Sequence, residues 1–158
     1  MKYLHIITVI AIVMWSCSSS NLTPVDKLYN KIASVNTHDS LPENPLNWKI
    51  ITFMLDRKQG TTATLYGNDI AVDYARHRTV KNYPLGARLA LVTWKQQEDS
   101  NWFGARIPAN ILSVEMVTFD NSMPQYNLYQ GQPLRLIANQ SAQFRQALIL
   151  SYRAAVTP

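Results

Sequence analysis

The chain contains a single cysteine, and its position limits how the fold can be held together. Cys17 lies in "MWSCSSSN", directly after an apolar run from Tyr3 to Trp15. Because a disulfide needs two thiols, no bridge can form within this sequence. The fold must be stabilised by apolar burial and hydrogen bonding. With 158 residues, 47% of them hydrophobic, the chain is long enough for one ordinary domain with a substantial core.

The residues around Cys17 have the pattern of an export signal. Lys2 begins a short polar start, and the apolar run that follows is shorter than the roughly 20 residues of a spanning helix. Ser16 and Cys17 then resemble the lipobox of bacterial lipoproteins, in which the cysteine is acylated and becomes the new N-terminus. We expect residues 1–16 to be a signal peptide and Cys17 to be lipidated. An ordinary signal peptide or a retained anchor is the alternative.

These expectations place the chain in the bacterial cell envelope. Two acyl chains would hold Cys17 to a membrane, with the rest of the protein facing the periplasm or the cell surface. Residues 17–47 are expected to form a lipidated tether, a short helix and a linker. Thr23-Pro24 has the composition of a helix start, this helix is expected to end near Asn36, and the prolines in 39–47 predict an extended linker.

Residues 48–158 are expected to form the main domain, in the α+β class. Strand-forming runs, interrupted by Gly and Pro turn signals, predict a mainly antiparallel β-sheet with helices packed on one face. The expected strands are residues 48–55, 61–66, 87–94, 102–107 (ended by Pro108) and 111–119. One helix is expected after a cap at Asn68. A second begins at Ser141, and its predicted buried face is Phe144, Ala147, Leu148, Tyr152 and Ala155.

The sequence lacks the short motifs of several large enzyme classes. It has no Gly-rich phosphate loop, no Gly-x-Ser-x-Gly and no His-Glu-x-x-His. His38 and His77 have no neighbours at metal-ligand spacing, so we expect no metal site and assign no catalytic residue. The net charge of +5 is scattered, and the cluster from Arg76 to Lys81 suits a helix end. We therefore expect no nucleic-acid partner.

The block "TLYGNDIAVDYARHRTVKNYPLGARLALVTWKQQEDSNWFGARIP" carries a family resemblance. Tyr66-Gly67-Asn68, then Ala71, then Tyr83-Pro84-x-Gly86 before an apolar strand, are similar to the cytochrome P-460 family, which is related to the β-sheet type of cytochrome c′. The resemblance covers roughly residues 48–158. It implies an exported, mostly β protein, often a homodimer, with c-type haem that oxidises hydroxylamine or binds nitric oxide and carbon monoxide.

The sequence departs from this family at the haem attachment site. Covalent attachment of c-type haem uses Cys-x-x-Cys-His, which the family carries near the C-terminus, whereas this sequence ends in "SAQFRQALILSYRAAVTP". We therefore expect no covalent haem, no other cofactor, and a ligand-binding or interaction module at the envelope. The alternative is a redox or gas-handling protein that binds haem non-covalently through His77, a lysine or a tyrosine. A purely structural envelope component is also open.

A set of seven residues in the central block is expected to bind a small-molecule ligand. Asn68 caps a helix at the turn that Gly67 permits. The aromatic residues either line a pocket or pack in the core, and Arg106 either pairs with Glu115 on a neighbouring strand or meets a ligand. The set is Tyr66, Asn68, Tyr83, Trp94, Trp102, Phe103 and Arg106.

Overall fold

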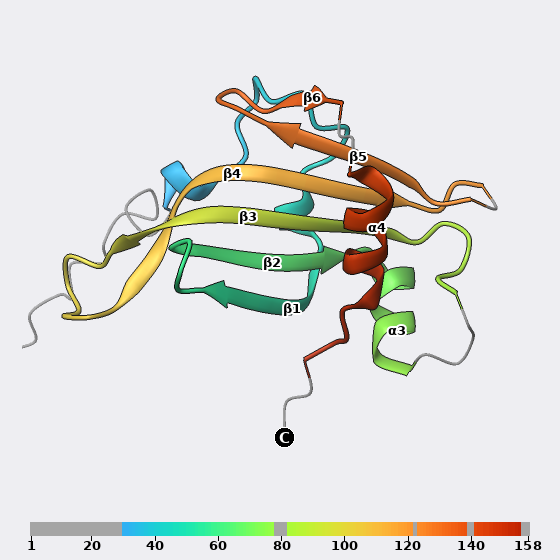
Figure 1. The fold of residues 1–158 in the computed structure, drawn as a ribbon, viewed down its shortest axis with the longest axis horizontal. Helices are drawn as coiled ribbons and strands as arrows, with labels where there is room; N and C mark the ends of the chain where they lie inside the picture. Colours follow the sequence, from blue (N-terminus) through green and yellow to red (C-terminus); the bar gives the residue numbers. More distant parts are fainter. Residues whose placement is uncertain (1–29, 78–81, 122, 139–140, 156–158) are drawn as a thin grey trace, which may run out of the picture. The chain divides into compact units, whose positions relative to one another are not determined.

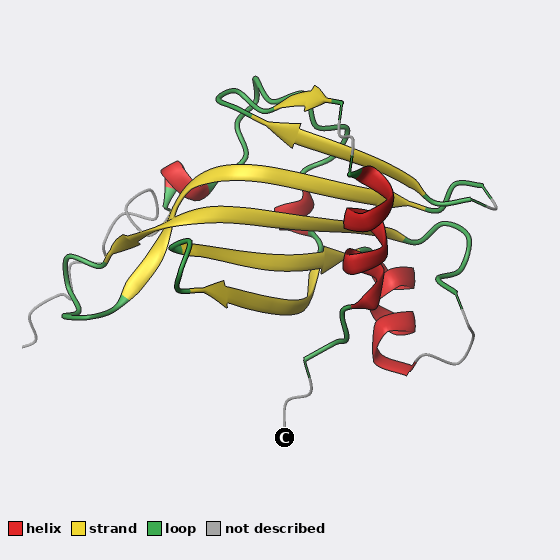
Figure 2. Ribbon diagram, viewed as in Figure 1, coloured by secondary structure: helices red, strands yellow, loops and turns green. Residues whose placement is uncertain are grey.

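One antiparallel sheet, whose strands lie side by side in the order of the sequence, dominates the structure (Figures 1 and 2). The computed structural model describes residues 30–77, 82–121, 123–138 and 141–155, so the predicted signal peptide, Cys17 and the predicted helix start at Thr23 lie outside the described residues. Six strands are present in these ranges: β1 Lys49–Asp56, β2 Thr61–Gly67, β3 Arg88–Glu98, β4 Arg106–Thr118, β5 Gln125–Gln130 and β6 Arg135–Ile137.

Two helices pack on one face of the sheet, as predicted (Figure 1). They are α3, Asp69–His77, and α4, Ala142–Ser151. Both contribute to a single apolar cluster with the sheet. The buried members of this cluster include Ala71, Val72, Tyr74 and Ala75 of α3, Ile149 of α4, and Leu65, Leu89, Leu91 and Val117 of the sheet. The α+β class is therefore consistent with the structure.

The opposite face is covered by residues 30–48, which precede β1 and which we call the N-terminal segment. This segment contains two 3-10 turns. The first, η1 Lys31–Ala33, lies where the sequence predicts the end of a helix, and the second, η2 Pro45–Asn47, lies in the predicted extended linker. Its apolar residues pack on a second cluster that includes Val92, Ile111, Val114 and Met116. Trp94 anchors this segment to the sheet, since its Nε1 donates a hydrogen bond to the carbonyl oxygen of Ala33 at 2.9 Å. Strand β3 is therefore buried from both sides, as its apolar sequence predicts.

Asn68 performs the predicted capping role and also fixes the loop before β3. Its Oδ1 accepts from the backbone N–H of Ala71 at 3.0 Å, which is the third helical position. The same oxygen accepts from the N–H of Arg88 at 3.1 Å, and Nδ2 donates to the carbonyl of Gly86 at 2.8 Å. One side chain therefore links α3, the turn at Gly86 and the start of β3.

Gly67 is required for space, which differs from the role predicted for it. A Cβ at this position would lie 2.7 Å from Cδ1 of Ile51 and 3.0 Å from Cβ of Ala71. Both distances are shorter than ordinary carbon contacts. The absence of a side chain lets α3 approach β1 closely.

The predicted end of a strand at Pro108 is wrong. The strands expected at 102–107 and 111–119 are one long strand, β4, which runs through Pro108. Pro108 lies opposite Gln96 beside a break in the register, and β5 begins to pair with β4 only at Ser113. A proline is tolerated there because irregular and edge positions do not need its missing N–H. Trp102 belongs to the turn between β3 and β4.

The predicted face of the last helix is also partly wrong. Helix α4 ends at Ser151, and its buried residue is Ile149, whereas Phe144 is 69% exposed. The reason is that Arg145, not Phe144, is directed to the sheet, where it forms an ion pair with Glu115. In the described ranges, no helix has the length and apolarity needed to span a bilayer.

Candidate functional site

Four of the seven predicted site residues lie in three separate places. Tyr66 and Trp94 are neighbours on the face covered by the N-terminal segment, with ring centroids 6.4 Å apart in an edge-on contact. Asn68 lies at the start of α3. Tyr83 is buried on the helix-bearing face, with its ring 4.2 Å from that of Tyr74. The structure does not bring these residues together in one pocket.

The other three predicted residues lie at the far end of the β3–β4 hairpin. Trp102 is 72% exposed and Phe103 is fully exposed, so neither lines a pocket or packs in the core. Arg106 and Glu115 are both on β4, and Arg106 instead approaches Glu98 at 4.0 Å. The predicted pairing of Arg106 with Glu115 is wrong. It required the two residues to lie on neighbouring strands, whereas both belong to the single strand β4.

A buried ionic cluster lies between the sheet and α4. Glu115 is 4% exposed, and its Oε2 accepts from the hydroxyl of Tyr126 at 2.6 Å and from Nε of Arg145 at 2.8 Å. Its Oε1 accepts from Nη2 of Arg145 at 2.5 Å. This hydrogen bonding raises the pKa of Arg145 above its ordinary value. The guanidinium is therefore held in a fixed, charged orientation.

The local sequence explains why this cluster forms. Side chains alternate along β4, which directs Glu115 to the same face as Val117. Tyr126 on β5 pairs directly with Val117, so its ring also lies on this face. A carboxylate buried on a sheet needs charged and hydrogen-bonding partners. Arg145, near the start of α4, supplies the charge.

Arg145 also lines a groove of about 580 Å³, which we call the helix-side groove. It lies between the β1–β2 hairpin and α4, on the helix-bearing face of the sheet. Its volume is within the range of small-molecule sites. The lining residues are Met54, Leu55, Asp56, Arg57, Lys58, Gln59, Thr61, Ala63, Leu91, Thr93, Arg145 and Tyr152.

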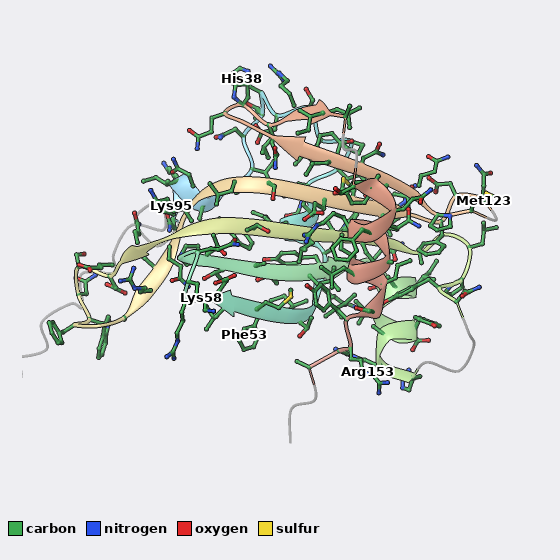
Figure 3. All side chains as sticks on the ribbon, in the orientation of Figure 1. His38, Phe53, Lys58, Lys95, Met123 and Arg153 are labelled. Carbon is green, nitrogen blue, oxygen red and sulfur yellow. The ribbon has the colours of Figure 1, made fainter. Side chains whose placement is uncertain are left out.

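The charges of the helix-side groove favour an anion. Arg57, Lys58 and Arg145 are cationic, and Figure 3 shows Lys58 projecting from the sheet. The one lining carboxylate, Asp56, accepts from the backbone N–H groups of Lys58 and Gln59 at 2.9 and 3.0 Å. The Asp56 carboxylate therefore stabilises the turn between β1 and β2. A guanidinium has five N–H donors, and Arg145 gives two of them to Glu115, which leaves three for a ligand.

A second cavity, of about 640 Å³, adjoins this region at the hairpin ends. It shares Leu55 and Arg57 with the helix-side groove, and Arg106 also lines it. Arg106 is therefore the predicted site residue that lies nearest to a cavity. The amide of Gln96 in this cavity is already engaged, because Nε2 donates to Oγ1 of Thr62 at 2.8 Å.

The groove contains few groups that can bind a metal. Among the described residues, no cluster of three or more His, Cys, Asp or Glu side chains is arranged around a common point. His77 does not line the groove, and its Nδ1 lies 3.1 Å from the carboxylate of Asp73 on α3. Apart from Asp56, whose carboxylate is engaged in the β1–β2 turn, the lining residues able to bind iron are Met54, Lys58 and Tyr152. The geometry is that of a binding site with an anchored cation.

Sequence reasoning missed Arg145 and Tyr126, although one signal was available. Glu115 is the only acidic residue within the apolar run from 111 to 119. A carboxylate at an inward strand position requires a cationic partner, and the predicted amphipathic helix offers two arginines, Arg145 and Arg153.

Comparison with known proteins supports the family resemblance. The family model described as Cytochrome P460 matches residues 42–128, which is more than half of the chain. The match includes β1 to β4, most of β5, and both Glu115 and Tyr126, and it ends before α4. No curated protein matches the chain. The chain belongs to the cytochrome P460 family.

Proposed function

We propose that this protein is a lipid-anchored binding protein of the bacterial envelope, in which a cytochrome P460 domain binds a small molecule without covalent haem. Cys17 is the proposed lipidation site, and the domain faces the periplasm or the cell surface. The proposed ligand is a small anionic amphiphile, meaning an apolar group that carries a carboxylate or a similar acid. The proposed site is the helix-side groove.

The observation that supports this ligand most directly is the position of Arg145. The Arg145 side chain is 32% exposed and lines the groove, and its guanidinium donates two hydrogen bonds to Glu115. A fixed guanidinium loses little side-chain freedom when it binds an acid, which favours binding. Arg57 and Lys58 add positive charge around the same groove.

The apolar floor of the groove supports an amphiphile over an inorganic anion. Met54, Ala63 and Leu91 line it and belong to the apolar cluster under α4. Burial of apolar ligand surface against them contributes about 25 cal/mol per Å². An acid without an apolar group would lose this contribution.

The residues present do not fit the haem chemistry of the family. Cys17 is the only cysteine in the sequence, so a Cys-x-x-Cys-His motif cannot be formed. The groove contains neither histidine nor cysteine, although Met54, Lys58 and Tyr152 are weaker candidates for an axial ligand. We therefore propose no reaction step through haem.

The ligand class can be tested by calorimetric titration of the full chain in detergent with 4-phenylbutyrate and with the neutral 4-phenylbutanamide. We expect the acid to bind and the amide to bind at least tenfold more weakly. Replacing Arg145 by Gln should lower the affinity for the acid at least about tenfold, because a charged hydrogen bond contributes about 1.5–3 kcal/mol to binding.

The matched control is Arg153→Gln, which removes an exposed arginine that does not line the groove. This variant should bind the acid like the wild type. Equal affinity for the acid and the amide, or an equal loss in both arginine variants, would show that Arg145 does not anchor an acid.

Non-covalent haem binding is the second candidate function, favoured by the family assignment. An absorption spectrum of the full chain, made in cells competent for haem maturation and then titrated with haem, distinguishes the two. We expect no stoichiometric Soret band. One haem per chain would overturn the haem-free proposal, and loss of that band in Met54→Ala or Tyr152→Phe would identify the ligand.

The anchor is tested separately from the ligand. Mass spectrometry of the chain expressed in a bacterium should show a mature N-terminus at Cys17 carrying acyl groups. Cys17→Ser should be released from the membrane fraction. An unmodified Cys17 in the membrane-bound protein would contradict the lipid anchor.

A further inference from the structure

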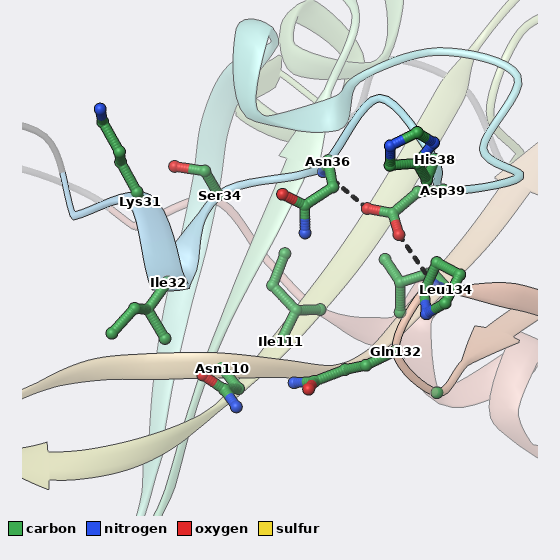
Figure 4. Close-up of a pocket in the computed structure, with 12 residues that line it drawn as sticks. Lys31, Ile32, Ser34, Asn36, His38, Asp39, Asn110, Ile111, Gln132 and Leu134 are labelled. Carbon is green, nitrogen blue, oxygen red and sulfur yellow. Dashed lines mark hydrogen bonds between the residues drawn. The ribbon is translucent and has the colours of Figure 1, made fainter.

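A third pocket, of about 480 Å³, lies where the N-terminal segment crosses the sheet (Figure 4). It opens on the face covered by that segment, since its lining residues Ile111 and Leu134 belong to the cluster on that face. Three elements contribute its walls: the segment around η1, strand β4, and the turn between β5 and β6. None of the predicted site residues lines it.

Three carboxamide side chains from these three elements define the pocket, which we call the amide pocket. They are Asn36, Asn110 and Gln132. In Figure 4, Gln132 extends toward Asn110, and Asn36 approaches Ile111 from the opposite wall. No side-chain hydrogen bond of these three amides is formed with the described residues. Each therefore offers a carbonyl acceptor and two N–H donors to a ligand.

The floor between the amides is apolar. Ile111 and Leu134 are 6% and 3% exposed and form the base, while the more exposed Ile32 stands at one side. A ligand that satisfies the amides therefore also meets an aliphatic surface. Burial of a methyl or methylene group there favours binding.

The pocket has little net charge to offer an ionic ligand. Asp39 lines it, but Oδ2 accepts from the N–H of Asn36 at 2.7 Å and Oδ1 accepts from the N–H of Leu134 at 2.8 Å. The Asp39 carboxylate therefore links the N-terminal segment to the turn between β5 and β6. Lys31 is exposed at the other end of the lining. Besides Lys31, the pocket offers a ligand the three amides, which are neutral and both donate and accept.

We propose that the amide pocket binds a secondary amide with a small aliphatic substituent. A carboxamide can pair with both the N–H and the C=O of such a group, and the aliphatic part then rests on Ile111 and Leu134. Acetamido sugars and short peptides both carry this chemistry. The proposal rests on residues that the helix-side groove does not use, so it stands or falls independently of the proposed function.

The test is an NMR titration of the full chain in detergent, in which the side-chain NH₂ signals of Asn36, Asn110 and Gln132 are followed. The probes are N-acetylglucosamine and N-acetylalanine methylamide, and glucose is the control without an amide. We expect saturable shifts of all three signals with at least one amide probe and none with glucose. The tighter of the two amide probes identifies the source.

Variants separate recognition from general surface binding. Asn110→Ala and Gln132→Ala should each lower the affinity for the amide probe about fivefold, as expected for the loss of one neutral hydrogen bond. Asn101→Ala, which removes an exposed amide in the β3–β4 turn, should have no effect. Saturable binding of glucose at equal affinity, no shift with either amide probe, or equal weakening in Asn101→Ala would overturn the proposal.

Discussion

At the residue scale, Glu115 is the most constrained polar group among the described residues. It is 4% exposed, and its carboxylate accepts three hydrogen bonds from Tyr126 and Arg145. Burial of a carboxylate is unfavourable unless its partners compensate for the lost hydration. The stability of this end of α4 therefore depends on Arg145 as much as on apolar packing.

Replacing Arg145 by Met should lower the free energy of unfolding by about 2–3 kcal/mol. The substitution keeps most of the apolar stem but leaves a buried carboxylate with Tyr126 as its remaining side-chain partner. Urea denaturation followed by circular dichroism measures the change. In the double variant Glu115→Gln/Arg145→Met, more than half of the loss should return. A single variant as stable as Arg153→Met would contradict this interpretation of the cluster.

Two tyrosines should make the protein less stable in alkali. Burial raises the pKa of Tyr66 and of Tyr129 above the ordinary value of 10.0. Their neutral forms are favoured by folding, so this contribution is fully present below about pH 10. It is lost as the pH rises through the raised values, because the unfolded chain ionises first.

Absorbance at 295 nm during alkaline titration checks this expectation. Tyr66→Phe should remove a late-ionising component, and its free energy of unfolding should fall less steeply above pH 10 than that of the wild type. A wild-type titration in which every tyrosine ionises together near pH 10 while the protein is still folded would contradict it.

At the scale of elements, the contact between α3 and β1 depends on a glycine. Gly67→Ala should lower the free energy of unfolding by about 1–3 kcal/mol, since the new Cβ would lie 2.7 Å from Cδ1 of Ile51. Thermal denaturation measures the change. Combining it with Ile51→Val removes the obstructing methyl group, so the double variant should lose less than the sum of the two single losses. Strict additivity would show that this contact does not limit the approach of α3.

The sequence predicts β1, β2, β3 and α3 well, because their signals are local, but it does not predict β5 or β6. The strands β1, β2 and β3 and the cap of α3 each follow from a few neighbouring residues, such as Asn68 and Ala71. The prediction at Pro108 is wrong because a strand can continue through a proline where no neighbouring strand needs its N–H, and this depends on where β5 stops pairing with β4. Phe144 misleads because the orientation of α4 is decided by Glu115, which is 30 residues earlier in the sequence than Arg145.

The candidate sites were much harder to predict than the strands. A pocket is formed by residues that tertiary structure brings together, and the helix-side groove joins the β1–β2 hairpin to α4. Trp102 and Phe103 have the composition of pocket residues, but they occupy a turn that the sheet does not cover. Composition alone cannot distinguish these cases, because aromatic residues occur in cores, pockets and exposed turns alike.

At the scale of the whole molecule, the N-terminal segment is the second layer over the sheet. Trp94→Phe should keep the ring buried while removing the Nε1 hydrogen bond to Ala33. We expect a loss of about 1 kcal/mol in the free energy of unfolding, together with faster amide hydrogen exchange in residues 31–41. Exchange in β3 should change much less. Unchanged exchange in 31–41 would mean that Trp94 does not anchor the segment.

The order of the strands also determines how the sheet can assemble. Each strand pairs with its neighbour in the chain, so a hairpin can close as soon as its second strand is available. Short-range pairings of this kind favour rapid folding, since little loop entropy is lost in forming them. A chain released from its N-terminus onward can therefore build the sheet in the order of release. Its C-terminal part, which holds Arg145, arrives last, so Glu115 is buried only when assembly is nearly complete.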